Sequence, residues 1–358
     1  MKKGFTHSCR FYTPLHFTHF LTIKLEKKKG KMEVVEDEEM IEKERIVFEE
    51  TKKKAEGGCV NSKIELLLFI YYGIGRKRSK KEAIKMCQEL YKETGDLFSS
   101  CLIVHYGWDK ERDSHTAYAL LKKVLEKKYN LLSDFLKAQV DQMLGYCLRE
   151  GIACPEDVEG SIAMYKKASE NHPNAMCNLG QFYETNYKNY KRAYQLYCKA
   201  AKRGFGNAFL CIGTMHYVGR HVEQDYRKAV LYYEHAISLG EDTAFTLMGN
   251  IYRDGILGEK DVMKAIEFYQ KGVDAGSDSA CFSLALIHKK GVGVEQDLSK
   301  TFLLYEMAAK RGHASSMNNL ALMYENGEGV QRSLEKAFFW YQQAANKNHP
   351  SAHYNIGV

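Results

Sequence analysis

A pattern that returns every 36 residues constrains the fold of this 358-residue chain more than any other feature of its sequence. The unit spanning residues 280–315 begins again one period earlier at Ala244 and one period later at Ser316. Each unit has the apolar spacing of two short amphipathic helices, with glycines after the first and an Asp before the second. A hairpin this short cannot bury its apolar face alone, so the copies are expected to stack on one another.

The start of the second helix is marked in each unit by a residue type that caps helices well. Ser, Asp and Asn side chains accept hydrogen bonds from the free amides of a first helical turn. Such a residue stands four positions before an Ala, Ser or Thr eight times: Ser79, Asp113, Asp157, Asn189, Asp225, Asp261, Asp297 and Ser333. Glycines that take a left-handed conformation at no steric cost are expected to end four of these helices, at Gly204, Gly240, Gly276 and Gly312. The register predicts eight repeats.

The unit A-x-x-x-L-G/A-x-x-Y-x-x-G-x-G-V, followed by D-x-x-K-A-x-x-x-Y-x-x-A-A-x-x-G, resembles the Sel-1-like repeat, a relative of the tetratricopeptide repeat. The match is strong over residues 208–351, good over 140–207 and weaker over 62–139. The resemblance implies an all-α fold, a right-handed α-solenoid of about eight two-helix repeats. It also implies a non-enzymatic scaffold or adaptor that holds other proteins together.

Two other functions follow from relatives of this repeat. Eukaryotic relatives serve in endoplasmic-reticulum degradation complexes and as activators of cell-wall synthases, so a lumenal adaptor of that degradation machinery is one alternative. Some cysteine-rich bacterial members are associated with β-lactam binding or hydrolysis and staple each repeat with a disulfide. This chain lacks that regular cysteine pairing, which leaves a β-lactam-binding or hydrolysing enzyme as the weaker alternative.

The chain before the repeats divides into two segments. Residues 1–31 form a basic tail that is expected to be disordered; a signal peptide, or an extension upstream of a start at Met32, are the alternatives. Residues 32–58 contain a charged amphipathic helix over 33–56, with early acidic residues and late lysines that suit the helix dipole. It is expected to cap the first repeat, with a coiled-coil partner helix as the alternative.

Within the repeat region, residues 62–351, one segment could be mistaken for a membrane span and two depart from the plain unit. The apolar run at 64–75 is too short to span a bilayer and aligns with the first helix of a repeat, so a packed helix is expected. Residues 129–139 lengthen the second repeat, by extending its helix or adding a turn, and the unit at 175–207 loses three residues in its loop. Residues 352–358 begin an incomplete ninth repeat.

Charge and cysteine usage narrow the class of partner and the compartment. The net charge of +7 comes from residues 1–31, and residues 32–358 carry 44 charges of each sign, so no basic face for nucleic acid is expected on the folded part. The ten cysteines form no C-x-x-C pair, and several occupy helical positions where a buried thiol packs as a small hydrophobe. A reducing compartment, the cytoplasm, is therefore predicted, with the endoplasmic reticulum as runner-up.

No residue group of this sequence has the spacing of a catalytic, cofactor or metal site. His216 and His288 occupy a position that is Tyr in neighbouring repeats, so both are expected to pack as aromatic side chains. Metal-ligand residue types occur in the tail, where adventitious binding is expected rather than a specific site: His7, Cys9, His16 and His19. Nucleophile-elbow, phosphate-loop, dinucleotide and H-E-x-x-H motifs are absent from the sequence. We expect no catalytic residue, no metal and no cofactor.

The remaining candidate site is a surface. In repeats of this kind the first helices line the concave face, and the side chains one and four positions after the Gly/Ala anchor are expected to point inward. We call these ten residues the first-helix row: Gln181, Glu184, Thr214, Tyr217, Asn250, Arg253, Leu286, Lys289, Leu322 and Glu325. The row mixes both charges with amides, an aromatic ring and apolar groups, which suits a protein or peptide ligand and not a phosphate backbone. The oligomeric state is not predicted.

Overall fold

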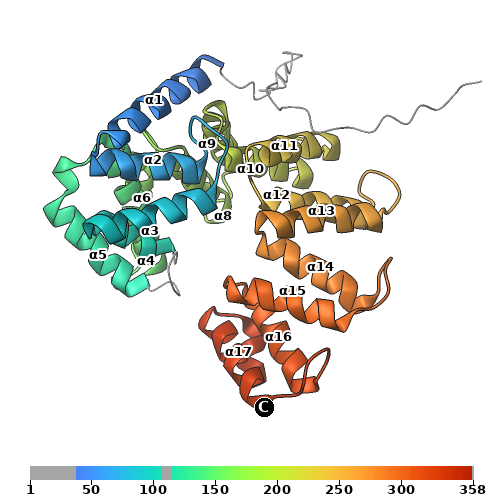
Figure 1. Ribbon diagram of the computed structural model, residues 1–358. Helices are drawn as coiled ribbons and strands as arrows, with labels where there is room; N and C mark the ends of the chain where they lie inside the picture. Colours follow the sequence, from blue (N-terminus) through green and yellow to red (C-terminus); the bar gives the residue numbers. More distant parts are fainter. Residues whose placement is uncertain (1–37, 107–113, 357–358) are drawn as a thin grey trace, which may run out of the picture. The chain divides into compact units, whose positions relative to one another are not determined.

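The computed structural model of this protein describes residues 38–106 and 114–356, and this part of the chain is entirely helical (Figure 1). It contains eighteen α-helices and one 3₁₀ turn, and no strand occurs within those two ranges. The tail predicted over residues 1–31 and the start of the charged segment, 32–37, lie outside the described residues. The prediction of an all-α solenoid of about eight two-helix repeats is confirmed.

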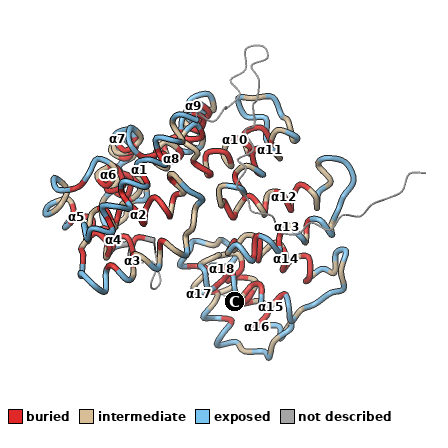
Figure 2. Tube along the Cα trace, turned by 45° about the horizontal axis from the view of Figure 1, so that its top comes forward, coloured by how far each residue is buried: buried red, intermediate tan, exposed pale blue. Residues whose placement is uncertain are grey.

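The helices alternate between the first and second members of successive hairpins. The first helices are α2 (Val60–Tyr72), α4 (Leu97–Tyr106), α6 (Asp134–Glu150), α8 (Pro173–Thr185), α10 (Gly206–Val218), α12 (Thr243–Asp254), α14 (Asp278–Lys290), α16 (Ala314–Asn326) and α18 (Pro350–Ile356). The second helices are α3 (Lys80–Thr94), α5 (Ser114–Lys127), α7 (Val158–Ala168), α9 (Tyr190–Lys202), α11 (Tyr226–Ser238), α13 (Val262–Ala275), α15 (Leu298–Lys310) and α17 (Leu334–Asn346). Helix α1 (Glu38–Glu56) precedes them, and the 3₁₀ turn η1 (Tyr129–Leu131) lies between α5 and α6. Figure 2 shows buried positions along the helices and exposed positions in the connecting loops.

The predicted caps begin the second helices in six of the eight units. Each of these caps accepts a hydrogen bond from the amide three residues later, as Asp261 does from Lys264 at 2.8 Å and Asp297 from Lys300 at 2.8 Å. Ser79 precedes α3, but its side chain makes no cap bond, so that prediction was wrong in its chemistry although right in its position. Asp113 lies outside the described residues. The glycines predicted to end second helices all have positive φ, between 70° and 96°.

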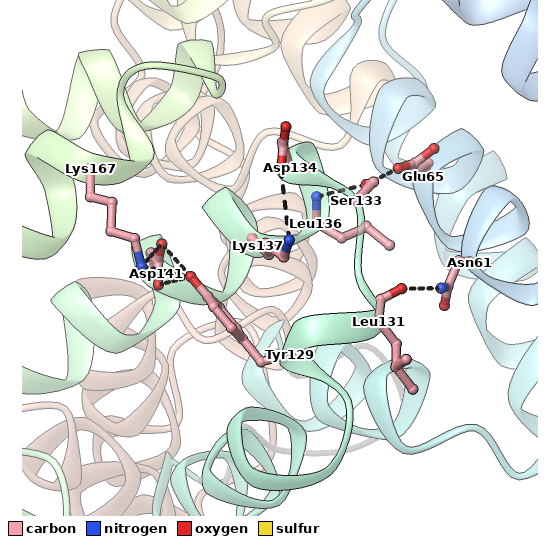
Figure 3. Close-up of polar contacts among 10 residues, drawn as sticks. All are labelled: Asn61, Glu65, Tyr129, Leu131, Ser133, Asp134, Leu136, Lys137, Asp141 and Lys167. Carbon is pink, nitrogen blue, oxygen red and sulfur yellow. Dashed lines mark hydrogen bonds and ion pairs between the residues drawn. The ribbon is translucent and has the colours of Figure 1, made fainter.

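The segment 129–139 adds a turn and does not extend the preceding helix (Figure 3). The new turn is fixed at one end by Asp141, whose two carboxylate oxygens accept from the Tyr129 hydroxyl at 2.9 Å, and which pairs with Lys167 at 3.0 Å. At the other end Asn61 of α2 donates to the carbonyl oxygen of Leu131 at 3.2 Å. The insertion therefore joins α2 to the start of α6, two repeats further along the chain.

An aromatic cluster extends this junction beyond the insertion. The ring of Phe135 packs edge-on against Phe69 of α2 and stacks on His172, with centroid distances of 4.8 and 4.7 Å. Tyr72, at the end of α2, contacts the same His172 at 4.8 Å and lies 6.3 Å from Phe205. Because His172 and Phe205 immediately precede α8 and α10, helix α2 packs across the starts of successive first helices. The apolar run at 64–75 is thus a packed helix, and no helix in the described part of the chain is long and apolar enough to cross a membrane.

The loop between α2 and α3 reaches still further along the chain, to the turn before α12. The guanidinium of Arg78 pairs with Glu241 at 2.5 Å, and the amide of Arg78 donates to the carbonyl oxygen of Leu239 at 3.2 Å. Lys80 pairs with Asp242 at 2.9 Å. Here two parts of the chain more than 160 residues apart are joined, although repeats in a simple solenoid contact only their neighbours.

Candidate functional site

The first-helix row is anchored by a close contact between a small residue of the first helix and a tyrosine of the second. The tyrosines stand 36 residues apart and are buried: Tyr197, Tyr233, Tyr269, Tyr305 and Tyr341. Each first helix offers a Gly or Ala at the facing position. A Cβ added to Gly249 would lie 2.4 Å from Cε1 of Tyr269, so this helix approaches the ring more closely than any side chain would permit.

The hydroxyl groups of four of these tyrosines bond to members of the first-helix row. Tyr269 donates to Oδ1 of Asn250 at 2.6 Å, and Tyr233 lies 3.2 Å from the Thr214 hydroxyl. The two carboxylates of the row also accept hydrogen bonds from tyrosine hydroxyls. Tyr197 donates to Glu184 at 3.0 Å, and Tyr341 donates to Glu325 at 2.6 Å. Burial raises the pKa of Tyr233 and of Tyr269 to about 12, so these phenols remain protonated donors at neutral pH.

The charged members of the row are also engaged in ion pairs. Glu184 pairs with Arg220 at 2.6 Å and Lys289 with Glu328 at 3.2 Å, and in both cases the partner stands on the following repeat. Arg253 makes a two-point contact with its neighbour Asp254 at 2.8 and 2.9 Å. That contact raises the pKa of Arg253 and lowers the pKa of Asp254. The row thus presents charges that are held in fixed positions and partly neutralised.

The other members of the row differ in how far they are exposed. Gln181 is exposed on α8. Tyr217 is half-buried, packs edge-on against Tyr226 at 5.4 Å, and has its pKa raised by burial and by the nearby Asp254. Leu286 and Leu322 are half-buried and pack against the hydrophobic core of the later repeats. The row therefore combines amide, phenol, charged and apolar groups within successive first helices.

The sequence predicts the residues of the row, but the tyrosine hydroxyls that bond to four of them were not predicted. Their signal was present in the unit, where Tyr recurs every 36 residues. A small residue stands 20 positions earlier, as in Gly249 and Tyr269, or 17 positions earlier in the shortened unit, as in Gly180 and Tyr197. The spacing alone does not say which polar side chain each hydroxyl will reach. Glu184 and Glu325 stand four residues after the anchor, whereas Thr214 and Asn250 stand one residue after it.

The histidines that replace tyrosine are buried, as predicted. His216 stacks on Tyr232 with centroids 5.4 Å apart and an interplanar angle of 11°. Burial lowers the pKa of His288. Within residues 38–106 and 114–356, no three His, Cys, Asp or Glu side chains are grouped as metal ligands would be. The tail residues His7, Cys9, His16 and His19 lie outside these ranges.

Comparison with known families supports the repeat register. A family model described as Sel1 repeat matches seven segments: residues 67–92, 142–172, 173–205, 207–241, 246–277, 278–313 and 314–349. These segments cover more than half of the chain. The hairpin of α4 and α5 has no match of its own, although it occupies the place of a repeat between the first two matched segments.

Several of the solved structures to which this chain is similar are of bacterial proteins. A Sel1 repeat protein from Oxalobacter formigenes is 24% identical, with 74% of this chain and 99% of that chain covered and a TM-score of 0.51, and it shows the same fold. A protective antigen of uropathogenic Escherichia coli with an SLR fold is 23% identical over 87% of this chain and 66% of that chain, with a TM-score of 0.41. The immunity protein Pa5087 from Pseudomonas aeruginosa is 19% identical over 60% of this chain and 80% of that chain, with a TM-score of 0.46. The search of curated proteins gave no match.

Proposed function

This chain belongs to the Sel1 repeat family, whose members generally act as protein-interaction scaffolds, and we propose that it is a non-enzymatic scaffold that binds a protein partner along the first-helix row. The observation that carries the proposal is the fixed arrangement of that row. Four of its polar side chains are held by buried tyrosine hydroxyls, so little conformational freedom remains to be lost on binding.

The chemistry of the row favours a peptide over a polyanion. Its four charged members, Glu184, Arg253, Lys289 and Glu325, sum to zero, whereas a phosphate backbone requires a continuous positive stripe. An amide side chain has two donors and an acceptor, so the bond from Tyr269 leaves the N–H groups of Asn250 able to donate to a ligand. Gln181 on α8 and Asn250 on α12 are the two amide side chains of the row, and amide donors suit the carbonyl groups of an extended segment.

The centre of the row is the part that supports the proposal best. Tyr217, Asn250 and Arg253 lie on the adjacent helices α10 and α12 and are all half-buried, so each combines contact area with a polar group. Tyrosine and arginine are also among the residue types that contribute most to the binding free energy of protein interfaces. We place the energetic centre of the contact on these three side chains, with Leu286 and Leu322 supplying apolar contacts further along.

We also propose the cytoplasm as the compartment in which this scaffold acts. The nine cysteines in the described ranges are free thiols, and six of them are buried. Thiols in that state are typical of proteins that fold under reducing conditions.

The test is capture of a partner by the full chain and by two matched variants. In the first variant Tyr217, Asn250 and Arg253 are changed to alanine. In the second the exposed second-helix residues Gln195, Glu234 and Gln342 are changed to alanine. The proteins captured from native lysate by the wild-type chain and by each variant are identified by cross-linking and mass spectrometry.

We expect the wild-type chain and the second variant to retain the same partner and the first variant to lose it. Cross-links should then map to helices α10, α12 and α14. If a partner is retained equally by both variants, the row is not the binding site. If the wild-type chain captures no specific protein, the scaffold function itself is wrong.

A further inference from the structure

Helix α1 is attached to the repeats by one narrow stripe. The side chains on that stripe, at helical spacing of three and four, are Ile41, Glu44, Phe48, Thr51 and Ala55. The last four are buried, and most of the remaining helix faces solvent, including the apolar residues Ile46 and Val47. Because α1 packs along α2 at the edge of the structure, this single stripe forms its attachment (Figure 1).

The groove beneath α1 is built from two pairs of residues far apart in the sequence. On one side Gly75 lets the backbone of α1 approach so closely that an added Cβ would meet the carbonyl oxygen of Glu44 at 2.6 Å. The guanidinium of the adjacent Arg76 lies over the Phe48 ring, 5.9 Å from its centroid. On the other side Gly204 faces the side chain of Ile41, and Arg203 pairs with Glu44 at 2.7 Å. The groove thus combines room for an apolar helix face with two fixed cations.

At the centre of the attachment, the buried carboxylate of Glu44 is only partly compensated by hydrogen bonds and opposite charge. Glu44 is buried, and among the described residues its Oε2 has no hydrogen-bond partner, although Oε1 accepts from Arg203. Burial raises the pKa of Glu44 in spite of the neighbouring guanidinium. Burying this ion pair costs desolvation free energy that its attraction to Arg203 only partly offsets, so α1 is held less tightly than its shape permits. An apolar residue in place of Glu44 would leave Arg203 without its carboxylate partner, so the acid is needed for recognition.

We propose that the groove between Gly75–Arg76 and Arg203–Gly204 is a docking site for an amphipathic helix of a partner protein, and that α1 occupies it as a displaceable internal competitor. The helix that the groove accepts carries an acidic residue one turn before a Phe, as Glu44 and Phe48 do, because the acid meets Arg203 and the ring meets Arg76. This surface is separate from the first-helix row, so either site can fail its test without affecting the other.

The first experiment releases α1 without altering the groove. Val47 is 46% exposed on the solvent side of α1, and proline there removes a helical hydrogen bond and disrupts the helix. The variants are the full chain with Val47→Pro and, as the control, Val47→Ala. The probe is a fluorescein-labelled peptide with the sequence of residues 37–57, blocked at both ends, and binding is followed by fluorescence anisotropy.

We expect the peptide to bind the Val47→Pro chain at least about tenfold more tightly than the control, since apparent affinity rises with the fraction of open groove. A peptide with Phe48→Ala should bind neither chain. Adding Arg203→Glu to the Val47→Pro chain should weaken the original peptide by about tenfold or more and favour a peptide with Glu44→Lys. If the Glu44→Lys peptide recovers the affinity that the Arg203→Glu substitution removes, the peptide lies in this groove.

Three results would overturn the proposal. The peptide binds the proline variant no better than the control, in which case α1 is a permanent cap. The proline variant loses its cooperative thermal unfolding by circular dichroism, which would make α1 part of the fold and not a competitor. Finally, sedimentation finds a wild-type dimer that the proline substitution dissociates, so that α1 of a second copy is the true occupant.

Discussion

The hydroxyl of Tyr269 donates a 2.6 Å hydrogen bond to Oδ1 of Asn250, while its ring lies against the bare Cα of the adjacent Gly249. One buried side chain therefore sets the distance between two helices and also orients a polar group of the first-helix row. The same relationship recurs between Tyr233 and Thr214, next to Gly213. Packing in the core and the arrangement of the proposed binding surface are thus coupled in each of these repeats.

Substituting Gly249 by alanine should destabilise the chain. The new methyl group would lie 2.4 Å from a fully buried ring, and overpacking of this kind costs about 1–3 kcal/mol. The gain of about 1 kcal/mol in helix propensity offsets only part of that cost. Urea denaturation measures the difference. The control is Ala285→Gly at the equivalent position, which is expected to cost about 1 kcal/mol from helix propensity and roughly another 1 kcal/mol from the loss of a buried methyl group. A Gly249→Ala chain more stable than wild type would contradict the contact.

Acid should destabilise the chain through His172. Its ring is fully buried among Phe135, Tyr72 and the guanidinium of Arg203, and burial, aided by Arg203, lowers its pKa to about 3. In the unfolded chain the pKa is ordinary, near 6.5. The unfolded state therefore binds a proton first, so stability present above pH 6.5 is lost as the pH falls towards 3, by up to about 4 kcal/mol.

Carboxylates titrate in the same pH range. Comparing the free energy of unfolding of wild type with that of the His172→Phe chain therefore isolates the contribution of His172. As the pH is lowered, the denaturant midpoint should fall less steeply for the His172→Phe chain than for wild type. The exposed His353→Phe variant serves as control and should follow the wild-type profile. Parallel profiles for His172→Phe and wild type would show that His172 does not titrate on unfolding.

The ion pair between Arg78 and Glu241 should contribute more to stability than the neighbouring pair of Lys80 and Asp242. The side chains of Arg78 and Glu241 are 14% and 5% exposed, and removing Arg78 leaves a buried carboxylate uncompensated. Arg78→Ala should therefore cost about 3–5 kcal/mol. Asp242 is also largely buried, at 10% exposed, but Lys80 is 41% exposed, so water already screens this pair and Lys80→Ala should cost only about 1 kcal/mol. Equal losses in thermal unfolding would argue against burial as the cause.

Cys59 should be the most reactive thiol among the nine described cysteines. It is exposed at the start of α2, and a hydrogen bond from the Ser62 side chain, followed by the Ser62 and Asn61 amides, lowers its pKa. A larger thiolate fraction at neutral pH gives faster alkylation. In contrast, burial raises the pKa of Cys87 to about 12. Iodoacetamide labelling with peptide mapping, in a Cys9→Ser background, should modify Cys59 first and Ser62→Ala should slow it. Faster modification of a buried cysteine would reveal local opening.

The sequence by itself determined the repeat architecture, because the signals that set it are local. Caps such as Asp261 and terminal glycines such as Gly276 act within one helical turn, and the 36-residue period fixes which helix follows which. The buried state of His216 and His288 could likewise be deduced, since each stands at a position held by tyrosine in neighbouring units. For residues 129–139 the sequence left two alternatives, a longer helix or an additional turn, and the 3₁₀ turn at Tyr129–Leu131 decides for the second.

Only the tertiary structure decided which distant parts meet. Arg78 and Glu241 stand 163 residues apart, and Glu44 and Arg203 stand 159 apart. Whether these residues contact each other depends on the total of the small rotations between successive repeats. A local sequence pattern does not determine that total rotation. For the same reason the sequence placed Glu184 and Lys289 in the first-helix row but could not show that Arg220 and Glu328 of the following repeats pair with them.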